Sequence, residues 1–124
     1  MNVIIFGPPG AGKGTQANNL VKKYNLYQIS TGDLLRSEVS NKTDIGRNIE
    51  NIISKGDFAT DEIVNELIQK VVSNPQKKNK LIFDGYPRSL SQAKNLDILL
   101  KSSNQKIDFI FFLNVKKETI IKRI

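Results

Sequence analysis

The feature that most constrains this chain is a glycine-rich segment near its N-terminus. Residues 7–15 read GPPGAGKGT, directly after an apolar run and directly before a helical pattern. Glycines allow the backbone to curl until several N–H groups point inward, and the start of the following helix adds positive potential. A loop of this kind between a strand and a helix is typical of a phosphate-binding P-loop, with Lys13 as its full positive charge.

This segment departs from the general P-loop pattern at one position. The pattern ends in Gly-Lys followed by serine or threonine, whereas Gly14 takes the hydroxyl position here and Thr15 follows it. The alternative, a plain Gly/Pro turn, would require the spaced glycines, the lysine and the strand–helix setting to coincide by chance. The predicted ATP-binding residues of the loop are Gly10, Ala11, Gly12, Lys13, Gly14 and Thr15.

The apolar pattern of the chain predicts an α/β fold. Four short apolar runs resemble strands, at residues 3–6, 26–29, 81–83 and 107–113. They are nearly continuous rather than alternating, which is typical of parallel strands covered on both faces. Helical patterns lie between them, and the clearest, with Thr60 as its N-cap, runs from Ile63 to Val72. The alternation predicts βαβ units around a central parallel sheet.

The organisation along the chain indicates one domain over residues 1–124, because no repeat, linker or low-complexity tract divides it. Residues 31–60 form a helical excursion that is longer than a single crossover needs, so it is either a substrate-binding flap or additional packing. A last helical pattern begins near Lys116 and reaches Ile124 without a stop signal. We therefore expect the chain to be truncated.

Composition excludes several chemistries. Cysteine and histidine are absent, which removes disulfides, thiolate metal sites and histidine catalysis. The formal charge is +7, but the lysines are spread along the chain without interleaved aromatic residues, so we expect no nucleic-acid partner. The longest apolar stretch, residues 109–113, is too short to cross a bilayer and no signal peptide is recognisable. We expect no membrane partner and a cytoplasmic location.

Two further motifs follow the glycine-rich loop: ISTGDLLR at residues 29–36 and DGYPR at residues 84–88. In order and spacing the three motifs resemble the adenylate kinase family of nucleoside-monophosphate kinases, from Asn2 to Ile124. The resemblance implies a P-loop three-layer fold, a monomer, and an AMP-binding insertion over residues 31–60. Four strands of the family's parallel sheet would be present and the fifth would be missing.

The resemblance also implies roles for the basic residues. Arg36 and Arg88 would clamp the monophosphate, and Arg123 would lie against the base and phosphates of ATP. A planar arginine fork binds phosphate in a way that lysine does not, and this chain keeps only four arginines beside fifteen lysines. Lys13, Arg36, Arg88 and Arg123 are the predicted catalytic residues, and surface salt bridging is the alternative role for the arginines.

Two aspartates are the predicted contacts to Mg²⁺, which would arrive as MgATP. Asp84 ends an apolar strand, where a carboxylate faces the ligand crevice of a parallel sheet and can hold a hydrated cation. Asp33 resembles the family's second acidic contact to the same hydration shell, and a helix cap is its alternative role.

Thr31 and Gln92 favour adenine as the acceptor base. A glutamine amide offers one donor and one acceptor, which match adenine's amino group and the neighbouring ring nitrogen. Gln92 follows Arg88 by four positions, which predicts one face of one helix. Relatives that accept pyrimidines tend to have a smaller residue at the position of Thr31. The predicted AMP-binding residues are Thr31, Gly32, Arg36, Asp57, Phe58, Ala59, Val64, Gly85, Arg88 and Gln92.

The implied reaction transfers the γ-phosphoryl group of MgATP to AMP and gives two ADP, with closure of residues 31–60 excluding water. The family's mobile lid begins just after the position of Arg123 and supplies further arginines. We therefore expect the 124-residue chain to be weak or inactive and marginal in stability. Two alternatives stay open: a nucleotide-binding fragment without catalysis, and a UMP/CMP kinase.

Overall fold

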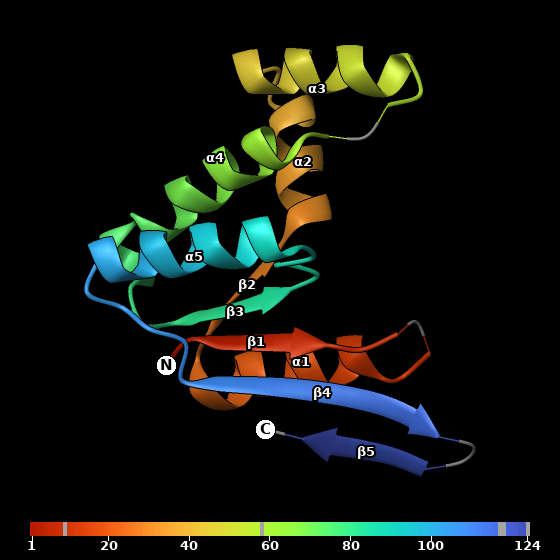
Figure 1. The fold of residues 1–124 in the computed structure, drawn as a ribbon, viewed down its shortest axis with the longest axis vertical. Helices are drawn as coiled ribbons and strands as arrows, with labels where there is room; N and C mark the ends of the chain where they lie inside the picture. Colours follow the sequence, from red (N-terminus) through yellow and green to blue (C-terminus); the bar gives the residue numbers. More distant parts are fainter. Residues whose placement is uncertain (9, 58, 117–118, 124) are drawn as a thin grey trace.

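The computed structural model describes residues 1–8, 10–57, 59–116 and 119–123, and it places one sheet at the centre of the chain (Figure 1). The strands are β1 (Val3–Phe6), β2 (Tyr27–Ser30), β3 (Leu81–Asp84), β4 (Phe109–Lys116) and β5 (Thr119–Arg123). Their order is β2-β3-β1-β4-β5, and the first four strands pair in parallel. The predicted α/β class and parallel sheet are confirmed; the bounds of β1 are as predicted, and those of the next three strands differ by at most three residues.

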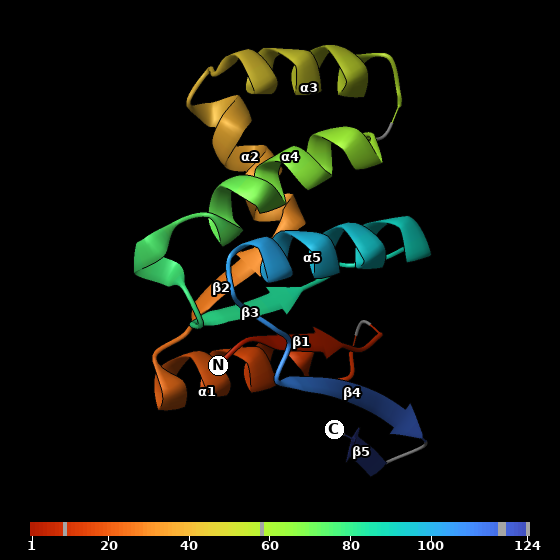
Figure 2. The same cartoon turned by 60° about the vertical axis from the view of Figure 1, so that its left-hand side comes forward.

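Helices cover both faces of this sheet. They are α1 (Lys13–Tyr24), α2 (Thr31–Ser40), α3 (Asp44–Ser54), α4 (Asp61–Val72) and α5 (Leu90–Ser102), with a short 3₁₀ turn η1 (Pro75–Lys77). Helix α1 lies on one side of the sheet and α4 and α5 lie on the other, as the turned view shows (Figure 2). Among the described residues, no helix combines the length and apolar character that crossing a membrane would require.

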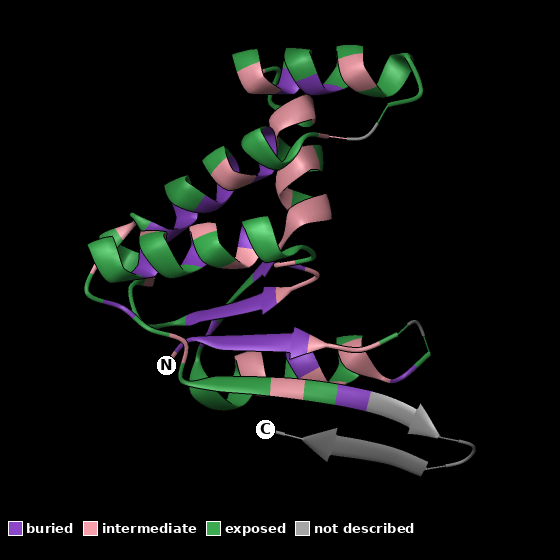
Figure 3. Cartoon of the chain, viewed as in Figure 1, coloured by how far each residue is buried: buried purple, intermediate pink, exposed green. Residues whose placement is uncertain are grey.

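Burial on two faces explains the continuous apolar runs of the strands. Val3 and Ile5 of β1 pack with Ala17 of α1, whereas Ile4 between them packs with Ile68 of α4 on the opposite face. Strands β1 and β3 are accordingly buried along most of their length (Figure 3). Because neighbouring residues point to opposite faces, every position of a strand covered on both sides must be apolar.

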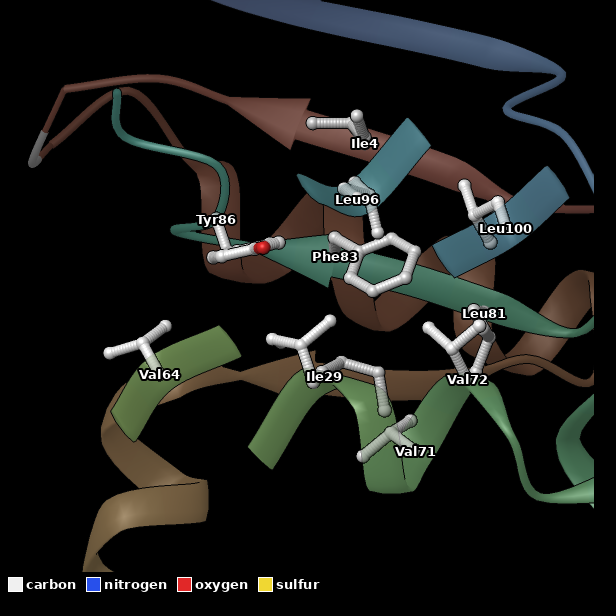
Figure 4. Packing of buried hydrophobic residues seen from close by; sticks show 11 residues of the cluster. Ile4, Ile29, Val64, Val71, Val72, Leu81, Phe83, Tyr86, Leu96 and Leu100 are labelled. Atoms are coloured by element: carbon white, nitrogen blue, oxygen red, sulfur yellow. The ribbon is translucent and has the colours of Figure 1, made fainter. Parts of the chain in front are cut away.

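The larger core lies between the sheet and helices α4 and α5. Phe83 is at the centre of this cluster, and its ring centroid lies 6.3 Å from that of Tyr86 (Figure 4). The Tyr86 hydroxyl lies 3.1 Å from Asn65 Oδ1 and 3.2 Å from the Gln92 carbonyl oxygen. Burial raises the pKa of the Tyr86 phenol, since the charged form would lose its hydration.

Residues of the predicted excursion form α2 and α3, which have a small core of their own with the start of α4. Ile49, Ile63 and Leu67 are buried there, and Leu34 contacts both this core and the larger one. Helix α3 lies at the end of the molecule farthest from β4 (Figures 1 and 2). The insertion is therefore packed as a unit beside the sheet rather than as an extension of it.

The predicted C-terminal helix is wrong. Thr119–Arg123 form β5, which pairs antiparallel with β4, and Ile124 lies outside the described residues. The β-branched residues at the start of this segment favour a strand, and their pairing covers the edge of β4 that would otherwise be open. The sheet thus has a fifth strand, of the opposite direction to the others.

Gly46, in the first turn of α3, touches the end of α2, and a Cβ atom there would lie 2.0 Å from the Glu38 carbonyl oxygen. We predict that Gly46→Ala lowers the free energy of unfolding by about 1–3 kcal/mol, because the two backbones must separate. Urea denaturation followed by circular dichroism measures the change. Gly14→Ala is the matched control, since nothing lies within 4 Å of its added Cβ. An equal loss in both variants would contradict the steric explanation.

Candidate active site

The glycine-rich loop lies at the carboxyl end of β1, between Phe6 and the start of α1 at Lys13. Gly10 and Gly12 have φ angles of +84° and +80°, a conformation that side chains disfavour. Gly12 is the N-cap residue of α1, so the loop leads directly into the N-terminal end of that helix. Exposed backbone N–H groups and the helix dipole together make this end suited to anions. Pro9 lies outside the described residues.

Lys13 and Asp84 meet beside this loop. Their Nζ and Oδ1 atoms are 2.9 Å apart, and the two side chains are 28% and 16% exposed. The contact follows from the sheet, because β1 and β3 are parallel neighbours with Ile5 opposite Asp84. Gln28 of β2 donates to the second carboxylate oxygen, Oδ2, at 3.2 Å. The Asp84 carboxylate is thus held between two donors at the carboxyl edge of the sheet.

Two cavities share the segment that follows β3. The first, of about 210 Å³, adjoins the glycine-rich loop and is lined by Ile5, Phe6, Gly7, Lys13, Gly85, Pro87 and Arg88. The second, of about 220 Å³, is lined by Thr31, Leu35, Ala59, Val64, Gly85, Arg88 and Gln92. Gly85 and Arg88 line both cavities, and Arg88 Nε donates to the Gly85 carbonyl oxygen at 2.7 Å. The Arg88 guanidinium is therefore held where the two cavities adjoin.

Gln92 is nearly buried, with 7% exposure, and its amide has a partner at each end. Its Oε1 accepts from the Arg88 backbone N–H at 2.7 Å, and its Nε2 donates to Asp61 Oδ1 at 2.8 Å. The prediction that Arg88 and Gln92 share one helix is wrong, because α5 begins at Leu90 and Ser89 is its N-cap. The extended backbone at Ser89 leaves Arg88 before the helix, and the direct hydrogen bond joins the two residues instead.

Arg36 and Asp33 pair with each other across one turn of α2, and each side chain is 73% exposed. The cap of that helix is Ser30, whose hydroxyl accepts from the Asp33 N–H at 3.5 Å, so Asp33 is not the cap. No group of three or more potential metal-ligating acidic, histidine or cysteine side chains occurs among the described residues. The single carboxylate of Asp84 beside the loop fits a Mg²⁺ ion that would keep its waters and bind mainly to phosphates, because such an ion needs few protein ligands.

The remaining predicted residues divide between the cavities and their surroundings. Gly14 and Thr15 are exposed in the first turn of α1. Gly32 lies against the Arg36 guanidinium, where an added Cβ would come within 3.1 Å. Asp57 is exposed and outside the cavity linings. Phe58 lies outside the described residues, as does the side chain of Arg123 on β5.

Several residues that line or contact the cavities are absent from the predicted site residues, and three of them contact or line the part of the site discussed above. Leu35 lines the second cavity, Gln28 contacts Asp84, and Asp61 contacts Gln92. The sequence offered a clue for Gln28, because it is a polar residue inside an otherwise apolar strand and could therefore have been predicted to contact the site. An acidic residue in the first turn of a helix, such as Asp61, is explained by the helix dipole alone. Its position in the sequence therefore does not predict a partner on another helix.

One protein family matches almost the whole of this chain. The family described as adenylate kinase matches residues 5–124. Over all 124 residues the chain is 56% identical to the adenylate kinase of Pelagibacter ubique and spans 58% of that protein. It is 46% identical to the adenylate kinase of Mycoplasma mycoides and 44% identical to that of Archaeoglobus fulgidus, and spans 57% of each. Because the family match covers nearly the whole chain, this chain belongs to the adenylate kinase family.

Proposed function

We propose that the protein to which this chain belongs transfers the γ-phosphoryl group of MgATP to AMP and gives two ADP. One observation carries the proposal: Gly85 and Arg88 line both cavities. Transfer between two bound nucleotides requires the donor and acceptor phosphates to lie next to each other, which two adjoining cavities with a shared arginine provide. Membership of the family and the names of the relatives support the same reaction.

The donor half would be the cavity at the glycine-rich loop. Backbone N–H groups and the start of α1 would hold the phosphates, and Lys13 would add its charge. An ammonium group has three donors, so Lys13 can bind a phosphate oxygen without leaving Asp84. Asp84 would accept hydrogen bonds from the waters of MgATP, whose metal ion neutralises phosphate charge.

The acceptor half would be the second cavity, with Gln92 and Thr31 at the base and Arg36 and Arg88 at the phosphate. The exposed Arg36–Asp33 pair contributes at most about 1 kcal/mol, so Arg36 is easily released to a phosphate. Arg88 is already fixed by the Gly85 carbonyl oxygen. No side chain has to form a covalent bond, because positioning and charge neutralisation supply the catalysis.

The test is ADP formation from MgATP by the purified chain, with AMP, CMP and UMP offered separately. ADP produced with AMP alone supports the proposal, whereas faster turnover with CMP or UMP would assign a pyrimidine kinase. Binding of ATP and AMP without turnover would make this chain a nucleotide-binding module. Failure to bind either nucleotide in a calorimetric titration would contradict the proposed site.

Lys13→Met should weaken ATP binding about 10- to 100-fold, because a charge-assisted contact to the phosphates is lost. Isothermal titration calorimetry measures the change. Lys22→Met is the matched control, since Lys22 is an exposed lysine in the last turn of the same helix. Unchanged ATP affinity in folded Lys13→Met, confirmed by its melting curve, would overturn the assignment of the donor cavity.

Gln92→Ala should reduce the preference for AMP over CMP about tenfold, because the amide that pairs with the base is removed. The ratio of the two dissociation constants is the readout. Gln69→Ala, an exposed glutamine on α4, is the control for a glutamine truncation on a helix of the same layer. A ratio that stays at the wild-type value would remove Gln92 from the acceptor site.

A further inference from the structure

The amide of Gln92 is held in one orientation by two partners of opposite kind. The backbone N–H of Arg88 can only donate, and it lies 2.7 Å from Oε1. The carboxylate of Asp61 can only accept, and it lies 2.8 Å from Nε2. Turning the amide over would place its oxygen against the carboxylate and its NH₂ group against an N–H. Both hydrogen bonds would become repulsive contacts of the nearly buried Gln92 amide, one of them with the exposed carboxylate of Asp61.

We propose that Asp61 is a positioning residue that makes the acceptor site select amino purines and reject oxo purines. The inference rests on the proposed function, in which Gln92 faces the acceptor base. With one lone pair of Oε1 and one N–H of Nε2 already used, the amide keeps one acceptor and one donor side by side. This edge matches adenine, which offers an amino donor beside a ring acceptor. Hypoxanthine and guanine offer a carbonyl acceptor beside a ring N–H donor, so they match only the reversed amide.

The backbone on both sides of this contact is fixed, so the choice is made by the side chains. Ser89 caps α5 by accepting from the Gln92 N–H at 3.1 Å. Thr60 caps α4 by accepting from the Ile63 N–H at 3.3 Å, and Asp61 is the first residue of that helix. Helices α4 and α5 pack directly against each other. Rotation of the Gln92 amide is therefore the simplest way in which the polarity of the site can change.

A different role for Asp61 is stabilisation of α4, because an acidic residue in the first turn interacts favourably with the helix dipole. That role predicts a loss of stability when the charge is removed, but no change in the choice of base. The two roles therefore separate in a measurement of selectivity. Glu62 provides the comparison, since it is exposed in the same first turn and carries the same charge.

The test is the ratio of the dissociation constants for IMP and AMP, measured by calorimetry on the purified chain and on Asp61→Asn. An asparagine presents either an oxygen or an NH₂ group, so it accommodates both orientations of Gln92. We expect wild type to prefer AMP, and Asp61→Asn to reduce this preference about tenfold, because a charge-assisted hydrogen bond that orients the amide is replaced by a neutral, reversible one.

Two further variants and their melting temperatures complete the experiment. Glu62→Gln should leave the ratio at the wild-type value, and Asp61→Glu, which keeps an acceptor-only group, should retain the preference for AMP. An unchanged ratio in folded Asp61→Asn, or an equal fall in Glu62→Gln, overturns the inference and leaves the proposed function standing. If Asp61→Asn does not fold, loss of the preference in Asp61→Glu overturns it. Failure of wild type to bind AMP overturns the proposed function, and the inference with it.

Discussion

The parallel pairing of β1 with β3 determines where every other part of the site lies. With Ile5 opposite Asp84, the loop after β1 and the turn after β3 leave the sheet at the same edge. A shift of the pairing by one residue would turn Val3 and Ile5 away from α1 and toward the opposite face of the sheet. Each side chain of the strand would then lose the helix that it packs against. Burial on two faces therefore fixes the register, and the register brings Lys13 to Asp84.

The two halves of the site differ in how firmly their charges are held. On the donor side, the partly buried Asp84 has Lys13 on one oxygen and Gln28 on the other, so removing either partner would leave a carboxylate incompletely compensated. On the acceptor side, Arg36 and Asp33 are exposed to solvent and their pairing is weak. Helix α2, which carries both residues of this pair, packs with α3 and α4 in a separate small core. The charges beside the glycine-rich loop are therefore already held in place, whereas Arg36, the proposed phosphate ligand of the acceptor half, is only weakly held.

The sequence predicted those elements whose burial produces a recognisable local pattern of apolar residues. The continuous apolar runs predicted β1 to β4 to within a few residues, and the glycine spacing predicted the loop before α1. The prediction from sequence failed at residues 119–123. The apolar pattern there is compatible with a helix and with a strand, and the strand forms because it pairs with β4. Asp61 and Gln92 are 31 positions apart in the sequence and belong to different helices. A local sequence pattern does not predict a contact between residues so far apart.

The start of α5 has a sequence signal that separates Arg88 from the helix. Ser89 and Gln92 have the spacing of a capping box, in which the third helical residue reaches back to the N–H of the cap. Recognition of that pattern would have placed the helix start after Arg88. In the structure the Gln92 side chain reaches one residue further back and takes the N–H of Arg88, which lines both cavities. The contacts at the start of α5 thus tie Gln92, which we propose contacts the acceptor base, to an arginine that lines both cavities. A change that reverses the Gln92 amide would consequently disturb the phosphate site as well as the choice of base.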